Sequence, residues 1–230
     1  MNKKSNKEQK VVMDKRYNNE ISKLKRKELY YLPWIGDNFA NSKTKLLILG
    51  ESNYIDKNRY GEEKDWNQTL IKNNFTQGIE KVKPHTVLNN LLRAIYNRSE
   101  IYKNEKCNFA EYIAFSNIVQ RPLKNSQDRP KNDDFLKGWK IMLELIKIIN
   151  PENIIIIGVT SIDYLLKTDN LDIEINKGKK NDSVYPREFL LPINGKKINC
   201  IAIKHTASYF SWEKWHKYIN KKINLKEIIN

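Results

Sequence analysis

Short apolar runs that end in glycine constrain the fold of this chain more than any other feature. Residues 45–50 read Lys-Leu-Leu-Ile-Leu-Gly, and residues 154–158 read Ile-Ile-Ile-Ile-Gly. A continuous apolar run of this length is typical of a strand that is buried on both faces, as in a parallel sheet. Residues 111–120, which end just before a proline, predict another strand.

A hairpin and several helices are predicted around these strands. The Asn-Gly pair at 194–195 predicts a hairpin between 188–193 and 197–204, whose second arm is the last strand. Apolar spacing and capping residues predict helices within residues 8–30, over 87–96, from Asp133 or Asp134 to Pro151, over 161–167, and after Ser211. The segments between them, 31–44, 55–84 and 123–132, are expected to be loops or irregular.

Alternating strands and helices predict an α/β fold with a mostly parallel sheet. We expect a basic N-terminal arm or helix over residues 1–30 and a single domain over residues 31–230. A length of 230 residues fits one domain, and a 40% share of hydrophobic residues is enough for a packed core.

The composition excludes several classes of protein. The longest apolar run is far shorter than the roughly 18 residues of a membrane span, and no secretory signal is visible at the N-terminus. Two cysteines, Cys107 and Cys200, are too few for a disulfide scaffold or an iron–sulfur cluster. The expectation is therefore a soluble cytoplasmic protein without a cofactor.

The net charge of +15, from 42 Lys and Arg against 27 Asp and Glu, favours a polyanionic partner, with nucleic acid first. Residues 1–28 hold ten basic and four acidic residues, and residues 196–230 hold eight lysines and two glutamates. Only eight of the 42 basic residues are arginine, which fits attraction to phosphates better than readout of base edges. A genome-wide bias toward Lys, Asn and Ile would explain the same charge without nucleic acid.

Polar side chains follow the predicted strands at the edge where ligands bind in open α/β sheets. Ligands of such sheets lie at the carboxyl ends of the strands. The residues expected there include a carboxylate, a carboxamide and an imidazole, namely Glu51, Asn117 and His205. Packing does not require polar residues of these types at that edge, so they are candidates for a functional site.

In the order of these segments the chain resembles the uracil-DNA glycosylase superfamily. Gly-Glu-Ser-Asn-Tyr at 50–54 resembles its first motif, which reads GQDPY or GEAPG in different branches. Ser-Asn-Ile-Val-Gln-Arg-Pro at 116–122 resembles its second motif, and His-Thr-Ala-Ser-Tyr-Phe at 205–210 resembles its last, HPSPLS. The helix, proline and strand that end at Gly158 complete the order, so the resemblance covers roughly residues 30–222.

The resemblance implies a three-layer α/β/α sandwich with a central, mostly parallel four-stranded sheet, and a monomeric enzyme that needs no cofactor. The implied activity is hydrolysis of the N-glycosidic bond of a base flipped out of DNA, which leaves an abasic site. The substrate is duplex DNA with an extruded base, or single-stranded DNA. Uracil is the family's usual base, and a hypermodified phage cytosine, removed in antiphage defence, is the alternative.

Three residues are expected to carry the chemistry. Glu51 would stabilise the positive charge that develops on the sugar and orient a water molecule. His205 would donate a hydrogen bond to the carbonyl of the departing base. Ser52 stands where the GQDPY branch has its catalytic aspartate, and would bind a phosphate or a water. An exposed loop glutamate and a histidine satisfied at a strand end are the structural alternatives.

The resemblance also implies residues that bind the base and the DNA. Asn117 would pair with the base edge, although a turn or cap role would explain it too. Asn53, Tyr54 and Phe75 would line the base pocket, with core packing as the alternative for Phe75. Tyr209 stands at the family's wedge position, and the residues that would bind phosphates around it are Lys204, Ser208 and Ser211.

Two family prolines are replaced here, one by Asn53 and one by Thr206. These replacements favour a second hypothesis, a catalytically inactive glycosylase-like module that binds DNA or a protein. A serine hydrolase built on Ser52 and His205 is a weaker alternative, because residues 50–54 lack the second glycine of a nucleophile elbow. A zinc enzyme is weaker still, because the three histidines and two cysteines show no ligand spacing.

Overall fold

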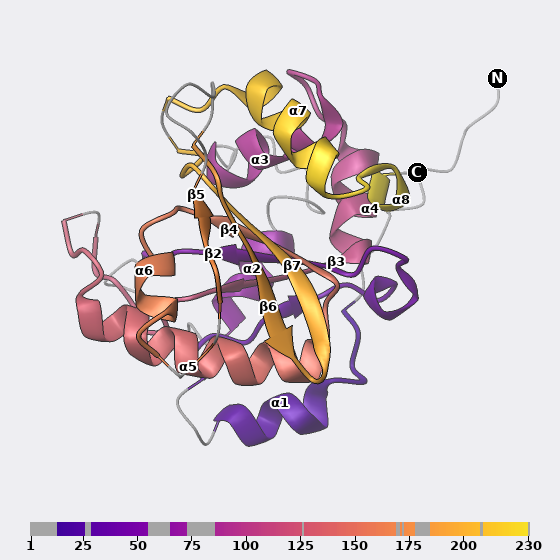
Figure 1. Ribbon diagram of the computed structural model, residues 1–230. Helices are drawn as coiled ribbons and strands as arrows, with labels where there is room; N and C mark the ends of the chain where they lie inside the picture. Colours follow the sequence, from indigo (N-terminus) through magenta and orange to yellow (C-terminus); the bar gives the residue numbers. More distant parts are fainter. Residues whose placement is uncertain are drawn as a thin grey trace, which may run out of the picture.

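One β-sheet with parallel and antiparallel strand pairs runs through the centre of the fold (Figure 1). The computed structural model describes residues 13–25, 29–54, 65–72, 86–125, 127–168, 171, 173–177, 185–207 and 209–229. Its strands are β1 (Trp34–Ile35), β2 (Leu46–Gly50), β3 (Ile113–Asn117), β4 (Asn153–Ile157), β5 (Asn176–Lys177), β6 (Arg187–Ile193) and β7 (Lys196–Ile203). They lie in the order β1-β3-β2-β4-β7-β6-β5.

The sheet combines parallel and antiparallel pairing. Strand β2 pairs in parallel with β3 on one side and with β4 on the other, and β4 pairs in parallel with β7. Strands β1, β6 and β5 join in antiparallel pairs. The predicted α/β class is confirmed, but the predicted four-stranded sheet was wrong in size, because β1, β5 and β6 extend it to seven described strands.

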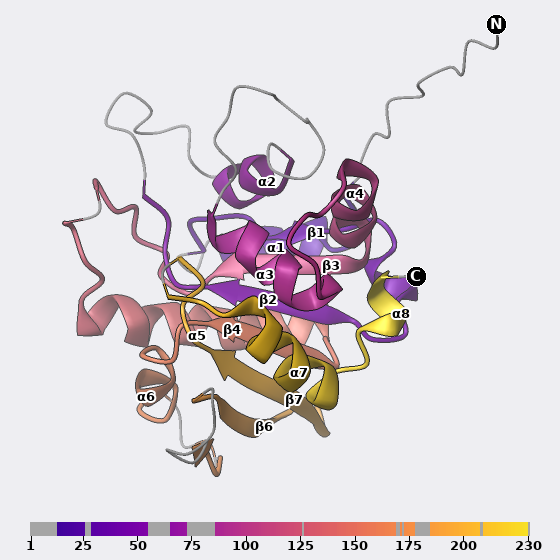
Figure 2. The ribbon, with the colours of Figure 1, turned by 90° about the horizontal axis from the view of Figure 1, so that it is seen from above.

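Helices cover both faces of the sheet (Figures 1 and 2). They are α1 (Asn18–Lys25), α2 (Trp66–Ile71), α3 (Thr86–Tyr96), α4 (Lys103–Tyr112), α5 (Asn132–Ile149), α6 (Ile162–Leu165), α7 (Trp212–Lys222) and α8 (Lys226–Ile229), with a short 3-10 helix at Phe39–Asn41. In the part of the chain that the structure describes, none of these helices has the length and hydropathy to cross a bilayer.

The alternation of side chains along β2 explains why this run is apolar throughout. Leu47 and Leu49 pack in the core on the α1, α5 and α6 side, whereas Leu46 and Ile48 pack under the helices on the other face. All four are fully buried. Because burial of each such side chain contributes about 1.5–3 kcal/mol, a strand between two helical layers is stable only when both of its faces are apolar.

Several predicted elements shift or gain neighbours in the structure. The strand expected over 111–120 spans only 113–117, because residues 111–112 end helix α4. Helix α5 begins before the predicted cap, at Asn132, and the Asp134 side chain accepts a hydrogen bond from the Lys131 N–H at its start. The segments expected to be loops or irregular contain β1, the 3-10 helix and α2.

The described part of the N-terminal segment packs against the domain. Helix α1 occupies residues 18–25 of the region in which a basic helix was predicted, and its Ile21 and Leu24 are buried against the α5 side of the sheet. Upstream of it, the Asp14 N–H donates to the Ile35 carbonyl oxygen at 2.9 Å. Residues 1–12 and 26–28 lie outside the described residues.

Helix α5 approaches the chain just after β3 so closely that only a glycine fits. A Cβ on Gly138 would lie 2.2 Å from the Ile118 carbonyl oxygen. Gly138→Ala would add about 1 kcal/mol of helix propensity, but the clash with backbone costs more, as overpacking typically does at about 1–3 kcal/mol. We therefore expect Gly138→Ala to lower the free energy of unfolding in a denaturant titration.

The neighbouring exposed position provides the control for this prediction. Lys137→Ala, on the solvent side of the same helix turn, should stay within about 0.5 kcal/mol of the wild type. A Gly138→Ala protein as stable as the Lys137→Ala protein would contradict the close approach of α5.

Candidate functional site

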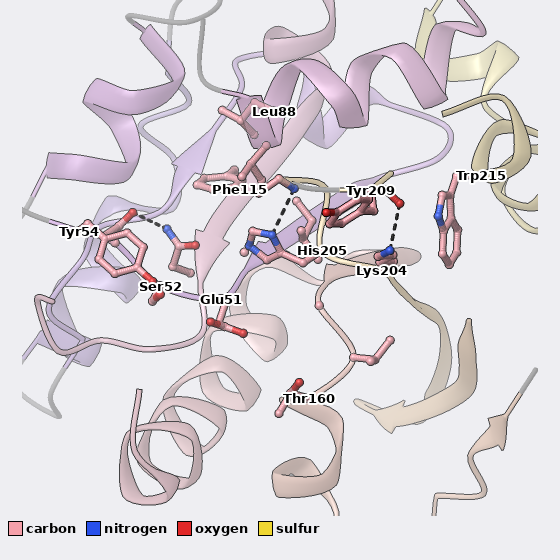
Figure 3. A pocket seen from close by; sticks show the side chains of 18 of the residues that line it. Glu51, Ser52, Tyr54, Leu88, Phe115, Thr160, Lys204, His205, Tyr209 and Trp215 are labelled. Carbon is pink, nitrogen blue, oxygen red and sulfur yellow. Dashed lines mark hydrogen bonds between the residues drawn. The ribbon is translucent and has the colours of Figure 1, made fainter. Parts of the chain in front are cut away.

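A cleft of about 900 Å³ opens at the carboxyl ends of β2, β3, β4 and β7 (Figure 3). Its position follows from the topology. The chain leaves β2 through helices on one face to reach β3, and then crosses through α5 on the other face to reach β4 on the opposite side of β2. Connections that depart on opposite faces leave a crevice between their strands, and this is where ligands of open α/β sheets bind.

The carboxylate of Glu51 and the ring of His205 face the same point in this cleft. Gly158, which directly follows β4, has a φ of +104° and lies between them. A Cβ built on Gly158 would lie 3.6 Å from Glu51 Oε2 and 3.9 Å from His205 Cδ2. The sequence-predicted carboxylate and imidazole are therefore brought together, and the glycine leaves the space between them open.

The hydrogen bonds of His205 determine which ring nitrogen can act on a ligand. The N–H of Ala207 donates to His205 Nδ1 at 3.3 Å. In the neutral ring the proton is then on Nε2, which is left as a donor. The side chain is exposed to the cleft, so Nε2–H is available to an acceptor on a bound molecule.

Thr206 fixes the loop that carries His205. It is fully buried, and its Oγ1 donates to the Val87 carbonyl oxygen at 2.7 Å. The side chain of Asn90 donates in turn to the Thr206 carbonyl oxygen at 2.7 Å. Both partners belong to α3, so two hydrogen bonds hold the loop against that helix where a proline would restrict it through its ring.

Asn53 and Asn117 belong to a buried cluster of three asparagines. Asn117 Nδ2 donates to Asn53 Oδ1 at 2.7 Å and to Asn67 Oδ1 at 2.9 Å, and Asn53 Nδ2 donates to Asn67 Oδ1 at 3.0 Å. Their exposed fractions are 4%, 0% and 3% for Asn53, Asn67 and Asn117. A carboxamide can serve several partners at once, so the cluster ties the loop after β2 to the end of β3 and to α2.

This cluster changes the interpretation of Asn117. Both Asn117 and Asn53 line the cleft, as predicted, but the amide nitrogen of Asn117 already donates two hydrogen bonds within the protein. Asn117 Oδ1 lies against Gly50, where a Cβ would be 2.1 Å away from it. The asparagine therefore shapes the floor of the cleft in addition to any contact with a ligand.

Asn67 was missed by the sequence analysis. It lies on α2, in a segment whose composition predicts irregular structure, and a lone asparagine there gives no signal of a buried hydrogen-bonded cluster.

Ser52 and Tyr54 lie on the loop after β2. Ser52 lines the cleft and is partly exposed, and within the described residues no hydrogen bond joins it to His205. Tyr54 is 39% exposed at the cleft mouth, and its hydroxyl accepts a long hydrogen bond of 3.4 Å from Arg129 Nη1. The pair that a serine hydrolase would use is therefore not formed here.

Tyr209 stands out from the rim of the cleft. Its side chain is 95% exposed, and its backbone has a φ of +51° in the left-handed region. Lys204 holds it from below, with Nζ 5.7 Å from the ring centre and a 3.0 Å hydrogen bond to the Tyr209 carbonyl oxygen. An exposed aromatic ring fixed beside a cation is a surface on which a base can stack.

The remaining predicted residues divide into two groups. Ser211 lines the cleft, and its hydroxyl donates to Glu213 Oε2 at 3.3 Å. Phe75 and Ser208 lie outside the described residues. Trp215, which also lines the cleft, is 3% exposed and stacks on Phe210.

The rim holds further cationic and aromatic side chains that sequence reasoning missed. Arg129, Tyr185 and Lys214 all line the cleft, and Tyr185 is 56% exposed. They come from three segments that are far apart in the chain, so only the fold brings them together. Three of the six large hydrophobic side chains that are exposed in the described residues, Tyr54, Tyr185 and Tyr209, therefore surround one cleft.

Arg121 fastens the loop that presents Arg129. Its guanidinium makes hydrogen bonds of 2.9–3.1 Å to both carboxylate oxygens of Asp128 and of Asp134. The side-chain hydrogen bonds from Arg121 lower the pKa of Asp128. Partial burial acts to raise the pKa of Asp134, but the hydrogen bonds from Arg121 and from the Lys131 N–H lower it on balance.

In the portion of the chain with described coordinates, no group of three or more His, Cys, Asp or Glu side chains is placed to hold a metal ion. No protein-family model matches the sequence, and no curated protein matches it.

The Arg121 cluster should make the protein sensitive to acid. A carboxylate whose pKa is lowered by folding contributes stability above its unfolded pKa of about 3.9 and loses that contribution as the pH falls through the folded pKa. Arg121→Gln should therefore lower the melting temperature at pH 6, and the difference from the wild type should close as the pH falls toward 2. A difference that stays constant across this range in thermal melts would contradict the role of the two aspartates.

Proposed function

We propose that this protein is a monofunctional DNA glycosylase that flips a damaged or modified pyrimidine into the cleft and hydrolyses its N-glycosidic bond. The observation that carries the proposal is the placement of Glu51 and His205 around one open point beside Gly158. The uracil-DNA glycosylase-like fold, the enzymatic activity and the DNA substrate all belong to this proposal.

The chemistry needs opposite stabilisation at the two ends of the bond that breaks. As the bond between the sugar and the base lengthens, positive charge develops on the sugar and negative charge on the base. Glu51 stabilises the cationic sugar and orients the water that adds to it, while His205 Nε2–H donates to the carbonyl oxygen of the departing base. Water supplies the hydroxyl group at the sugar and the proton that the released base takes up.

The rim supports a nucleic-acid substrate. Exposed Tyr54, Tyr185 and Tyr209 offer ring faces to bases, and Lys204 and Arg129 offer charge to phosphates. A base must leave the stack before Glu51 can reach its sugar, and the exposed ring of Tyr209 is the side chain that would fill the space that the base leaves.

The shape of the cleft determines which base the enzyme accepts. Uracil remains the first candidate, and a hypermodified phage cytosine, removed in antiphage defence, is the second. A cleft of about 900 Å³ lies near the upper end of the range of about 300–1,000 Å³ for ligand sites, so it has room for a flipped base with or without an additional group. Tyr54 at the mouth and the Asn53 cluster at the floor are the side chains that would limit such a group.

The cellular setting of this activity is also part of the proposal. Cys107 and Cys200 are both buried, and within the described residues neither forms a disulfide. Such thiols suit the reducing cytoplasm, where the enzyme would act as a monomer without a cofactor.

The alternative is an inactive glycosylase-like module that binds DNA or a protein. The observation that favours it is the use of Asn53 and Thr206, in place of family prolines, in hydrogen bonds that serve the protein itself. The same rim would then bind nucleic acid without cleavage.

Release of a base from oligonucleotides tests the proposal. We expect abasic-site cleavage with at least one of uracil, hypoxanthine, a thymine mismatch or a modified cytosine, and a loss of about 100-fold or more in Glu51→Gln and in His205→Ala. Glu152→Gln, at the opposite end of β4, is the matched control and should keep full activity. Oligonucleotide binding without release of any base would favour the inactive module, and release that is undiminished in both variants would overturn the assigned roles.

Removal of the exposed ring at position 209 tests the stacking role. Tyr209→Ala should weaken oligonucleotide binding by about 10-fold, because loss of one stacked base costs about 1–3 kcal/mol. The substitution should leave the fold intact, because the side chain contacts solvent and not the core. Tyr209→Phe, which keeps the ring, should restore binding. As the control, Tyr102→Ala removes an exposed tyrosine that does not line the cleft, and this variant should bind the oligonucleotide as the wild type does. Equal oligonucleotide binding by all three variants would exclude the stacking role.

A further inference from the structure

Helix α7 carries a stripe of lysines that begins at the cleft. Lys214, Lys217 and Lys221 are exposed, and their spacing of three and four residues puts them on one face of the helix. The opposite face is buried through Trp215 and Ile219. The stripe is therefore the solvent face of an amphipathic helix whose other side packs against the sheet and α3 (Figure 2).

The direction of α7 connects this stripe to the cleft. Its first turn lines the cleft through Lys214 and Trp215. Its last turn lies near the amino-terminal ends of β4 and β7, since the Asn199 side chain donates to the Lys222 carbonyl oxygen at 3.0 Å. Asn199 pairs with Asn153 at the start of β4, whereas the carboxyl ends of β4 and β7 face the cleft, so the helix leads away from the cleft mouth.

Among the described residues the stripe forms no direct ion pair, although Lys221 lies close enough to Glu188 to help lower the pKa of that carboxylate. Lys222, on the buried side, forms an ion pair of 2.6 Å with Glu188. Within the described residues, no such pair is formed by Lys214, Lys217 or Lys221. Glu213 is an acidic residue beside the first turn of the stripe, and one of its oxygens accepts a hydrogen bond from Ser211.

The spacing of the stripe suits a nucleic-acid strand. Seven residues of α-helix span about 10 Å, which equals about three base-pair steps along the axis of a duplex at a rise of roughly 3.4 Å per step. Lysine is a flexible point charge, so the three ammonium groups can each follow a phosphate without reading the bases.

We propose that Lys214, Lys217 and Lys221 form a phosphate track that binds the backbone of the strand flanking the nucleotide in the cleft. This inference rests on the proposed function for the identity of the ligand, but it concerns binding and not cleavage. Lys204, below Tyr209 at the rim, is the point where the strand passes from the cleft toward α7.

The salt dependence of binding tests the track. Each phosphate contact adds about 0.7 to the slope of log K against log salt for single strands and about 0.9 for a duplex. The double variant Lys217→Gln/Lys221→Gln should therefore reduce the slope by about 1.4 on a single-stranded oligonucleotide or by about 1.8 on a duplex. Neither residue lines the cleft, and glutamine keeps the helix propensity, so thermal melting should be unchanged.

The matched control removes the same charge at the other end of the sheet. Lys196 and Lys197 are exposed at the start of β7, far along the strand from the cleft. Lys196→Gln/Lys197→Gln lowers the net charge equally and should leave the slope unchanged. If both double variants change the slope equally, or if neither does, the track is wrong.

Measurements in the Glu51→Gln background separate this inference from the proposed function. Binding of an intact oligonucleotide is then followed without cleavage. Loss of slope in the α7 variant with no base release by any form of the protein would keep the track and reject the glycosylase. Base release by the wild type, together with an unchanged salt-dependence slope in the α7 variant, would keep the glycosylase and reject the track.

Discussion

The pairing of β2 with a parallel neighbour on each side is the constraint on which the site depends. Because β3 and β4 follow β2 in the chain yet lie on opposite sides of it, their connections depart on opposite faces of the sheet. The loops after β2 and β4 therefore have no helix packed between them. Glu51 and Gly158 lie in these two loops, and the cleft opens where they meet.

Two glycines make this meeting possible for different physical reasons. At Gly50 a Cβ would collide with Asn117 Oδ1 at 2.1 Å, so the absence of a side chain lets the asparagine cluster close over the end of β2. At Gly158 the φ of +104° turns the chain away from the strand direction, and a Cβ would occupy the space between Glu51 and His205. The apolar runs that end in glycine are thus tied both to burial of the strands and to the shape of the cleft.

Much of the fold was predictable because its signals are local. Continuous apolar runs identified β2 and β4, and the Asn-Gly pair identified the β6–β7 hairpin, whose turn residue Asn194 has the expected left-handed backbone. Strands β1 and β5 were missed because two residues carry no periodicity, and their pairing depends on partners that are distant in sequence. The extent of β3 was overestimated at both ends, because residues 111–112 end α4 and residues 118–120 continue beyond the strand without regular secondary structure.

The candidate site was predictable only in part. Glu51, Asn117 and His205 follow strands, so strand prediction alone places them at one sheet edge. Asn67, Arg129 and Lys214 reach the same region from α2, from a loop and from α7, and no local pattern indicates this. The Arg121 cluster shows the same limit, since a guanidinium shared by Asp128 and Asp134 depends on how a loop folds back on its own helix.

The position of the positive charge carries more information than its amount. Within the basic C-terminal segment, Lys196 and Lys197 lie at the end of the sheet away from the cleft, and Lys222 is neutralised by Glu188. What remains near the cleft is Lys204 at the rim and the α7 stripe that starts with Lys214. A composition bias alone would distribute lysines over every exposed surface, whereas a bound strand needs them in a line along its backbone. Three lysines on one face of a helix that begins at the cleft meet that second requirement, and the lysines at the other end of the sheet do not.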